Sequence, residues 1–275
     1  MTDRPLAIVT GAASGIGKAF AIRLAAQGYD LLLVDLDAES LKQASLQASQ
    51  SGAAIDSLCG DVSDQEFWAG VIDHLESGRR PQVLINSAGL LLGGSIEQCS
   101  MDQTRRIIEV NLLGVIYGCQ AVAPRLEIRG GAPLPCGVIN VASIFASVTP
   151  PNFSAYNSSK AGVVALTETL GHELAHRGFV ATAVLPGLTS TALFDRAEYA
   201  NQDIKKNVCS YAANAELTAD DVAERSLRAF AKKKPLVTIG RRATLYRMIH
   251  RFLPWLLRPL VRRKSQQALG SSGDQ

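Results

Sequence analysis

The chain has 275 residues and a mass of 29.3 kDa, which suits one large α/β domain or two small ones. Apolar residues make up 47% of it and charged residues 19%, so the composition excludes global disorder. No apolar run reaches the ~18 residues of a membrane-spanning helix, and the N-terminal segment lacks the apolar core of a signal peptide, so we expect a cytoplasmic protein. Five scattered cysteines without a C-x-x-C pair argue against a disulfide scaffold and against a cysteine-rich zinc module.

Charge is distributed unevenly along the chain. Residues 1–224 contain 15 Lys and Arg against 24 Asp and Glu, a net charge of −9. Residues 225–275 contain 13 Lys and Arg against one acidic residue, a net charge of +12. An acidic body with a basic tail suggests an anionic partner for the tail. Outside the tail the basic residues are not interleaved with aromatic ones, so we expect no nucleic-acid partner.

Short apolar runs alternate along the chain with longer segments of helical periodicity. Runs that are apolar throughout are typical of strands buried on both faces of a parallel sheet, and the segments between them are long enough for crossover helices. The alternation predicts a single Rossmann-type, doubly wound α/β domain with about seven parallel strands flanked by helices. The predicted strands cover residues 6–10, 31–35, 55–61, 83–86, 137–143, 180–186 and 236–239.

The first predicted strand leads directly into a glycine-rich turn, residues 10–17 (TGAASGIG), and then into a helix. Gly11 permits a tight turn, Gly15 lets the backbone approach a pyrophosphate, and Gly17 lets the helix pack close to the strand. The helix N-terminus offers N–H groups and the positive end of its dipole to phosphates. A glycine-rich turn can also be only a turn, but one placed between a strand and a helix predicts a dinucleotide site.

Asp35 ends the second predicted strand, 18 residues after Gly17. A carboxylate at this position accepts hydrogen bonds from a ribose 2′-hydroxyl and repels a 2′-phosphate. Neither Leu36 nor Ser14 supplies a cation for such a phosphate. We therefore predict NAD(H) rather than NADP(H) as cofactor, the alternative being that Asp35 only caps the strand end or the following helix.

Tyr156 and Lys160 lie four residues apart in a segment of helical pattern, so they share one helix face. A neighbouring ammonium stabilises a phenolate, so we expect the pKa of Tyr156 to fall from ~10 toward neutrality. A tyrosine tuned in this way can exchange a proton with an alcohol or carbonyl oxygen. Ser143 ends the fifth predicted strand, at the sheet edge where ligands of such folds bind.

Together with the glycine-rich turn, these residues resemble the short-chain dehydrogenase/reductase family, in particular its NAD-dependent hydroxysteroid and retinol dehydrogenase-like members. The resemblance covers roughly residues 5–240. The sequence departs from the family's Asn-Asn-Ala-Gly motif at Ser87, which replaces the second Asn, and we expect the turn to survive. Further pieces match in order along the chain: Asp61-Val62, Asn86 to Gly89, Asn111, Pro186-Gly187, Thr189 and Thr191.

The resemblance implies a role for each of four catalytic residues. Tyr156 would be the general acid/base, Lys160 would lower its pKa and hold the nicotinamide ribose, Ser143 would orient the substrate oxygen, and Asn111 would fix a proton-relaying water. The resemblance also implies a homodimer or homotetramer. The implied cofactor contacts are Gly11, Ser14, Gly15, Ile16, Gly17, Asp35, Asp61, Val62, Asn86, Ala88, Gly89, Tyr156, Lys160, Pro186, Gly187, Thr189 and Thr191.

These features predict hydride transfer between NAD(H) and a hydrophobic secondary alcohol or ketone of steroid, retinoid or fatty-acyl type. The apolar character follows from Ile144, Phe145 and Phe153, which we expect around the catalytic residues. One alternative is a 3-oxoacyl carrier-protein reductase, which Asp35 disfavours because such enzymes generally use NADPH. The other is a non-catalytic NAD(H)-sensing or membrane-associated binding protein, which would not need all four catalytic residues.

Residues 172–176 (HELAH) match a metalloprotease pattern whose two histidines share a helix face. A zinc site needs a third ligand and an open cleft, and the only later histidine is His250, so we expect no metal site.

Residues 1–240 are predicted to form the dinucleotide-binding and catalytic domain, which includes one long insertion and is followed by one extension. Residues 188–215 form a long insertion after the sixth strand, a place where such folds often carry a substrate lid. Residues 241–275 form a basic C-terminal extension. Within it, residues 244–264 place arginines on one side and leucines and aromatics on the other, which is typical of an interfacial segment. The segment would contact an anionic membrane peripherally or pack on its own body or on a second subunit.

Overall fold

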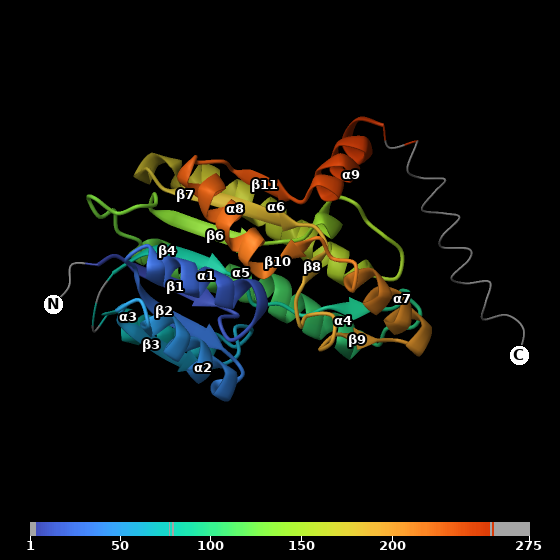
Figure 1. Ribbon diagram of the computed structural model, residues 1–275, viewed down its shortest axis with the longest axis horizontal. Helices are drawn as coiled ribbons and strands as arrows, with labels where there is room; N and C mark the ends of the chain where they lie inside the picture. The colour runs from blue at the N-terminus through green and yellow to red at the C-terminus, as the bar shows by residue number, and fades with distance from the viewer. Residues whose placement is uncertain (1–3, 77, 79, 254, 256–275) are drawn as a thin grey trace, which may run out of the picture.

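The computed structural model describes residues 4–76, 78, 80–253 and 255. Its centre is a parallel sheet of seven strands in the order β11-β7-β6-β4-β1-β2-β3, with helices on both faces (Figure 1). This arrangement confirms the predicted doubly wound α/β fold. The strands are β1 (Leu6–Thr10), β2 (Asp30–Asp35), β3 (Ile55–Cys59), β4 (Pro81–Asn86), β6 (Gly137–Val141), β7 (Val180–Pro186) and β11 (Leu236–Ile239).

Two predicted strands are longer than the observed ones. The predicted run 55–61 ends at Cys59, and the predicted run 137–143 ends at Val141. β3 is also not buried on both faces, because it is the edge strand and pairs only with β2. Its residues Asp56, Ser57 and Cys59 are exposed, as befits a polar edge.

Each face of the sheet carries its own helical layer and its own apolar core. Phe20, Leu24 and Phe230 belong to the core on one face, and Trp68, Val115 and Val163 belong to the core on the other. The first layer consists of α1 (Gly15–Ala26), α2 (Ala38–Ser49) and α8 (Ala219–Ala231). The second consists of α3 (Gln65–Glu76), α4 (Met101–Ile108), α5 (Gly114–Val122) and α6 (Ser154–Leu174).

The chain order creates a crevice in the middle of the sheet. From β1 the chain builds outward through β2 and β3, and then returns to β4 on the other side of β1. At such a switch point the loops after the two central strands run in opposite directions, which opens a ligand site at their carboxyl ends. The hydroxyl of Thr10 ties the two ends together by accepting hydrogen bonds from the backbone N–H groups of Ser87 and Ala88, at 3.1 and 3.2 Å.

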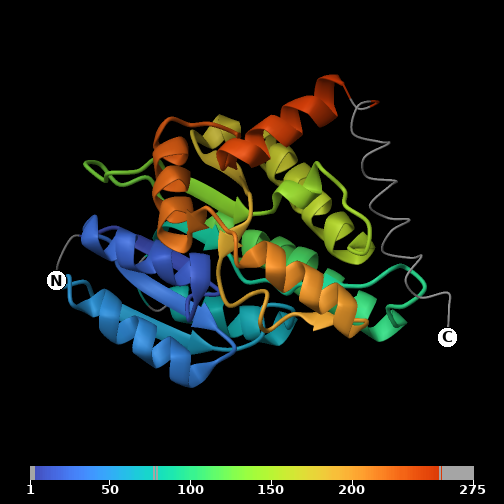
Figure 2. The ribbon, with the colours of Figure 1, turned by 45° about the vertical axis from the view of Figure 1, so that its right-hand side comes forward.

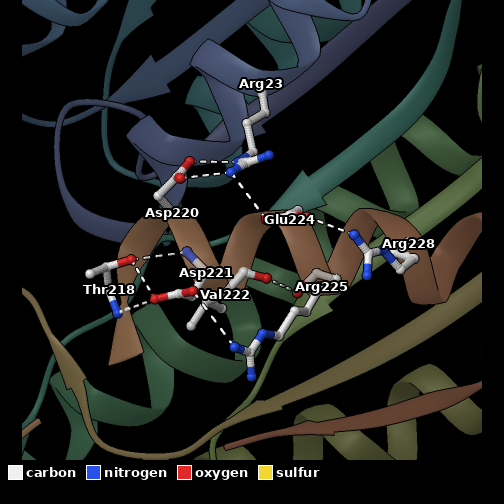
Figure 3. Close-up of polar contacts among 9 residues, drawn as sticks. Arg23, Thr218, Asp220, Asp221, Val222, Glu224, Arg225 and Arg228 are labelled. Atoms are coloured by element: carbon white, nitrogen blue, oxygen red, sulfur yellow. Dashed lines mark hydrogen bonds and ion pairs between the residues drawn. The ribbon is translucent and has the colours of Figure 1, made fainter. Parts of the chain in front are cut away.

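Polar contacts fix α8 against α1 (Figure 3). Arg23 of α1 donates two hydrogen bonds to the carboxylate of Asp220, at 2.5 and 2.6 Å. Thr218 and Asp221 form a reciprocal capping box at the start of α8. These contacts hold two helices that are almost 200 residues apart in sequence side by side on one face of the sheet.

The insertion 188–215 contains β8 (Thr189–Ser190), β9 (Glu198–Tyr199) and α7 (Gln202–Ala212). β8 pairs with β10 (Leu217–Thr218), and β9 pairs with β5 (Leu92–Gly93), in two small parallel sheets. These pairings hold the start and the middle of the insertion at the carboxyl edge of the main sheet.

The C-terminal extension begins with α9 (Arg241–Phe252), which stands at the edge of the molecule in both views (Figures 1 and 2). α9 ends two residues before Pro254 in the sequence, in keeping with the rule that proline stops a helix. Most of the rest of the predicted interfacial segment 244–264 lies outside the described residues.

One helical run in the described part of the chain, Met101–Arg125, is long and apolar enough to cross a membrane by length and composition. The sequence predicts no run of that length and apolar character, so this helical run differs from the prediction. In its most apolar window 56% of the residues are buried inside the protein. α4 and α5 belong to this run and pack in the second helical layer, which accounts for its apolar character.

Candidate active site

A cavity of about 410 Å³ opens at the carboxyl ends of the central strands. Most of the residues predicted to bind cofactor or to act in catalysis line it, although they come from the ends of six different strands and from α6. Five predicted residues do not line it: Asn86, Asn111, Ile144, Phe145 and Phe153. The predicted residues that do are Gly11, Ser14, Gly15, Ile16, Gly17, Asp35, Asp61, Val62, Ala88, Gly89, Ser143, Tyr156, Lys160, Pro186, Gly187, Thr189 and Thr191.

The glycine-rich turn forms one end of the cavity. Gly11 has a φ of +67°, and a Cβ there would lie 2.7 Å from the backbone nitrogen of Ala88. A Cβ on Gly17 would collide with the carbonyl oxygen of Gly11. Ser14, the N-cap residue before α1, makes no capping bond with its side chain, so the helix N-terminus faces the cavity with backbone donors. This cradle of backbone and helix dipole fits a pyrophosphate.

The carboxylate of Asp35 accepts hydrogen bonds from the backbone N–H groups of Ala13 and Asp37, at 2.9 and 3.1 Å. These bonds tie the glycine-rich turn to the end of β2. Asp35 also lines the cavity, so it presents negative charge where an adenosine ribose would lie in a bound dinucleotide.

Two arginines that the sequence did not single out, Arg106 and Arg196, also line the cavity. Arg106 of α4 donates to Asp61 at 2.7 Å and to Ser63 at 2.9 Å. Arg196, from the insertion, lies 4.0 Å from the carboxylate of Asp37. No local sequence signal indicates either residue, because both reach the cavity from segments distant in sequence.

Asp61 is held in its charged form by these contacts. Burial works against the charge, but hydrogen bonds from Ser63 and the guanidinium of Arg106 hold the pKa of Asp61 below its usual range. Both carboxylate oxygens are therefore engaged within the protein, one with Ser63 and one with Arg106.

Asn86 points into the core rather than into the cavity. Its side-chain amide donates to Asn140 at 2.9 Å, and Asn140 donates in turn to Thr167 of α6 at 2.9 Å. All three side chains are buried. The side chain of Asn86 therefore belongs to a buried polar chain that links β4, β6 and α6 beneath the site, and a cofactor contact by Asn86 stays a prediction.

Ser143, Tyr156 and Lys160 meet at the other end of the cavity. Ser143 follows β6, and its hydroxyl caps the short 3₁₀ turn Ile144–Ala146 by accepting a hydrogen bond from Phe145 at 3.2 Å. Tyr156 and Lys160 lie on one face of α6, with the ammonium nitrogen 6.0 Å from the centre of the phenol ring. The same nitrogen donates to the carbonyl oxygen of Val141 at 3.0 Å.

Burial governs the protonation of this pair. It raises the pKa of Tyr156 to about 12, although the hydroxyl of Ser143 opposes the rise by stabilising the phenolate. It lowers the pKa of Lys160 to about 8. The expected fall in the pKa of Tyr156 is therefore wrong for this structure, because removal of water from the phenol outweighs every favourable contact.

Asn111 lies behind Lys160, in a π-helical turn, Glu109–Leu113, between α4 and α5. Its amide accepts from the backbone of Leu90 at 2.7 Å and donates back to the same residue at 2.9 Å. A Cβ on Gly89 would lie 3.2 Å from the Asn111 oxygen and 3.3 Å from the Lys160 nitrogen. Both side chains therefore converge on Gly89. Such π-turns occur frequently at functional sites.

An apolar cluster surrounds Tyr156. The ring of Phe145 meets it edge-on at 6.1 Å between centres and lies 5.3 Å from the ring of Phe153. Ile144 is buried, but it lies outside this cluster. Leu193 and Phe194, from the insertion, join the cluster and also line the cavity. The length of the insertion indicates a lid, but nothing in its amino-acid sequence distinguishes these two residues from their neighbours.

The two histidines of the HELAH segment do not share a helix face. α6 ends at Leu174, and His176 lies in the 3₁₀ turn Ala175–Arg177. Its ring contacts the carbonyl oxygen of Glu173 at 2.7 Å. Within the described residues, no group of three His, Cys, Asp or Glu side chains is placed to hold a metal ion.

The chain is similar to proteins of known family and structure. It is 34% identical to the 2-dehydro-3-deoxy-L-rhamnonate dehydrogenase (NAD(+)) of a Sphingomonas strain over 73% of this chain and 78% of that protein. A short-chain dehydrogenase/reductase of Burkholderia phymatum in complex with NAD superimposes with a TM-score of 0.79 and 28% identity, covering 92% of this chain and 95% of that one. A short-chain dehydrogenase of Burkholderia cenocepacia in complex with NADP gives a TM-score of 0.74 and 26% identity, over 87% and 98%.

The chain spans about half the length of other relatives, 44% in the case of the probable oxidoreductase EphD of Mycobacterium tuberculosis, to which it is 29% identical. The family model of the short chain dehydrogenases matches residues 5–202, which include the glycine-rich turn, Ser143, Tyr156 and Lys160. The chain therefore belongs to the short-chain dehydrogenase/reductase family.

Proposed function

We propose that the protein is an NAD(H)-dependent dehydrogenase that interconverts a hydrophobic secondary alcohol and its ketone. The observation that carries the proposal is the convergence of Ser143, Tyr156 and Lys160 on one end of a cavity whose other end is a phosphate cradle. A proton-transfer group and a dinucleotide site in one cavity suit an oxidoreductase that acts on CH–OH groups.

The residues present fit a nicotinamide dinucleotide. The glycine-rich turn and the N-terminus of α1 would hold its pyrophosphate, because both line the cavity and the close backbone packing at Gly11 and Gly17 holds the turn in place. The turn after β7, at Pro186-Gly187, and the nearby Thr189 and Thr191 would hold the nicotinamide end. When bound, the nicotinamide supplies or accepts the hydride.

We infer a preference for NAD(H) from the charges around the ribose site. Asp35 and Asp37 both line the cavity there and would repel a 2′-phosphate. The cations near them are already engaged, Arg106 with Asp61 and Arg196 with Asp37. The carboxylates therefore dominate the local field.

The chain's own residues perform the proton chemistry. The oxygen of Tyr156 takes the proton from the substrate hydroxyl during oxidation, and it returns a proton to the carbonyl oxygen during reduction. Ser143 holds the substrate oxygen beside this phenol. Lys160 stabilises the phenolate and holds a ribose, and Asn111 fixes a water that continues the proton path behind it.

An apolar substrate is favoured by the side chains around Tyr156. Leu193 and Phe194 line the cavity and cluster about the phenol with Phe145 and Phe153 packed behind the wall, so a polar substrate would lose hydration there without gaining partners. A steroid, retinoid or fatty-acyl alcohol matches this surface. Residues 188–215 act as the lid over it, because they contribute Leu193 and Phe194. We place the enzyme in the cytoplasm as a homodimer or homotetramer, as is common in this family.

NADH formation from NAD on a panel of hydrophobic secondary alcohols tests the proposal, with Tyr156→Phe measured alongside. The variant should lose turnover by about 10²-fold to 10⁴-fold and keep its affinity for NADH. Tyr246→Phe, a change of the same size on exposed α9, is the matched control and should behave as the wild type. Equal turnover by wild type and Tyr156→Phe would refute the assignment.

A further inference from the structure

α9 packs on the body through one face and turns an apolar stripe outward on the other. On the inner side, Ala243 is buried and Arg247 reaches Thr238 at 3.4 Å. On the outer side, Leu245, Met248 and Phe252 follow the spacing i, i+3, i+7, which places them within an arc of about 60°. They are 57%, 55% and 68% exposed. We call these three residues the outward stripe.

This orientation is the reverse of an ordinary surface helix, whose apolar side faces the core. The alternative that the apolar side packs on the protein's own body therefore does not hold for Leu245, Met248 and Phe252, whereas the neighbouring Ile249 is half-buried. The apolar surface also continues beyond the helix, since Leu253 and Trp255 are 42% and 64% exposed. Both views show α9 at the rim of the molecule (Figures 1 and 2).

Positive charge surrounds the outward stripe. The helix carries four arginines and no acidic residue. Arg242 pairs with Glu216 at 3.0 Å, whereas neither Arg241 nor Arg251 forms an ion pair with any residue of the described chain. On the helical wheel Arg241 falls inside the arc of the stripe, and Arg251 lies beside it.

We propose that the outward stripe of α9 docks on the surface of an anionic lipid bilayer. Exposed Leu, Met and Phe side chains would enter the boundary between headgroups and acyl chains, and the arginines would contact anionic headgroups. A bilayer fits this surface better than a second copy of α9 does, because two such helices face to face would bring their unpaired arginines together.

The docking surface is joined to the wall of the active-site cavity. Ala243, at the base of α9, packs against Gly187, where a Cβ would lie 2.9 Å from the Ala243 side chain. Gly187 itself lines the cavity. Docking by α9 therefore brings this wall of the cavity close to the bilayer, from which an apolar substrate can enter. Only this last step rests on the proposed function, since the docking depends on α9 alone.

Flotation of the full-length chain with lipid vesicles tests the docking directly. Wild type should bind vesicles that contain phosphatidylserine, bind pure phosphatidylcholine vesicles at least tenfold more weakly, and dissociate as salt is raised. Arg241→Gln with Arg251→Gln should weaken binding by about 20-fold to 30-fold, since each arginine near the surface contributes about fivefold. Leu245→Ser with Met248→Ser and Phe252→Ser should abolish it at any salt concentration.

Matched controls carry the same changes elsewhere on the surface. Arg105→Gln on α4 and Leu46→Ser on α2 change an exposed arginine and a 62% exposed leucine away from α9, and both should bind as the wild type. Because all the substituted side chains are exposed, circular dichroism and NADH affinity should be unchanged in every variant. These readouts separate a failure of docking from a failure of the proposed function.

Three outcomes would overturn the docking proposal. The first is a wild type that ignores phosphatidylserine vesicles, and the second is a set of α9 variants that bind them as the wild type does. The third is a stripe variant that changes only the oligomeric state in sedimentation, which would assign the outward stripe to contact between copies of the chain.

Discussion

The ammonium of Lys160 donates its hydrogen bond to the carbonyl oxygen of Val141, at 3.0 Å, from a side chain that is only 5% exposed. Its pKa falls from 10.5 to about 8 because burial disfavours the charged form. A depressed pKa means that the folded state binds the Lys160 proton less tightly than the unfolded chain does. The charge therefore costs stability at neutral pH, by about 3 kcal/mol if the whole shift is counted.

This relationship predicts a pH-dependent gap between the wild type and Lys160→Met. The stability of the wild type relative to the variant should be lowest below about pH 8, and it should rise as the pH approaches 10.5, where the unfolded chain also loses the proton. Urea unfolding of both proteins across this range measures the gap, and other titrating groups cancel in the difference. A gap that is flat from neutral to alkaline pH would show that burial does not control this amine.

The raised pKa of Tyr156 predicts how turnover depends on pH. Because burial raises its pKa to about 12, the phenolate that oxidation needs is scarce at neutral pH. Alcohol oxidation should therefore accelerate as the pH rises, whereas ketone reduction, which uses the protonated phenol, should change little over the same range. The measurement is kcat/KM against pH in both directions.

Ser143→Ala supplies the control for that profile. The variant removes the hydroxyl that stabilises the phenolate, so the alkaline limb of its oxidation profile should move to higher pH. Loss of substrate orientation would lower the rate at every pH but would leave the position of the limb unchanged. A limb at the wild-type position would therefore mean that Ser143 acts on the substrate alone.

The fold was predictable because its signals are local. Uninterrupted apolar runs, such as residues 6–10 and 180–186, are typical of buried parallel strands, and both coincide with β1 and β7. The glycine-rich turn was likewise recognisable from its place between a strand and a helix. Strand ends were less predictable, since β6 stops at Val141 although Ala142 is also apolar.

The site was only partly predictable because some of its properties depend on three-dimensional packing. Arg196 comes to Asp37 from a segment more than 150 residues away, and no spacing rule indicates such a contact. Asn86 follows the expected motif, yet its amide is needed by Asn140 in the core. The i, i+4 spacing placed Lys160 beside Tyr156 correctly, but spacing carries no information on burial, which sets the direction of both pKa shifts.

Asp35→Ser should shift the cofactor preference toward NADPH. The change removes the carboxylate that repels a 2′-phosphate and leaves Arg196 and Arg106 in the cavity wall. We expect the ratio of kcat/KM for NADPH to that for NADH to rise by about tenfold or more, a difference of ~1.4 kcal/mol. Kinetics with both cofactors measure the ratio.

Adding Arg196→Gln to Asp35→Ser tests where the gain comes from. If Arg196 attracts the 2′-phosphate, the double variant should lose most of the improvement. Asp35 also accepts a hydrogen bond from Ala13, so unfolding curves are needed to separate a change in preference from a loosened turn. An unchanged cofactor ratio in Asp35→Ser would mean that Asp35 serves only to hold the turn.

The ion pair between Arg23 and Asp220 predicts a modest, salt-sensitive contribution to stability (Figure 3). The pair has two short hydrogen bonds, but its side chains are 27% and 64% exposed, so solvent screens it. A double-mutant cycle with Arg23→Ala and Asp220→Ala should give a coupling free energy of about 0.5–1 kcal/mol that shrinks as salt is added.

The same guanidinium lowers the pKa of Asp220, so the coupling free energy should also decrease as the pH drops and the carboxylate is protonated. Arg225→Ala, which removes an exposed i,i+4 pair with Asp221 within α8, is the control, because Glu224, the partner of Arg228, also pairs with Arg23 at 3.4 Å. If the control loses less unfolding free energy than Arg23→Ala does, the stabilisation by Arg23 comes from joining α8 to α1. If both variants lose the same amount, the pair between Arg23 and Asp220 contributes no more than an ordinary surface pair.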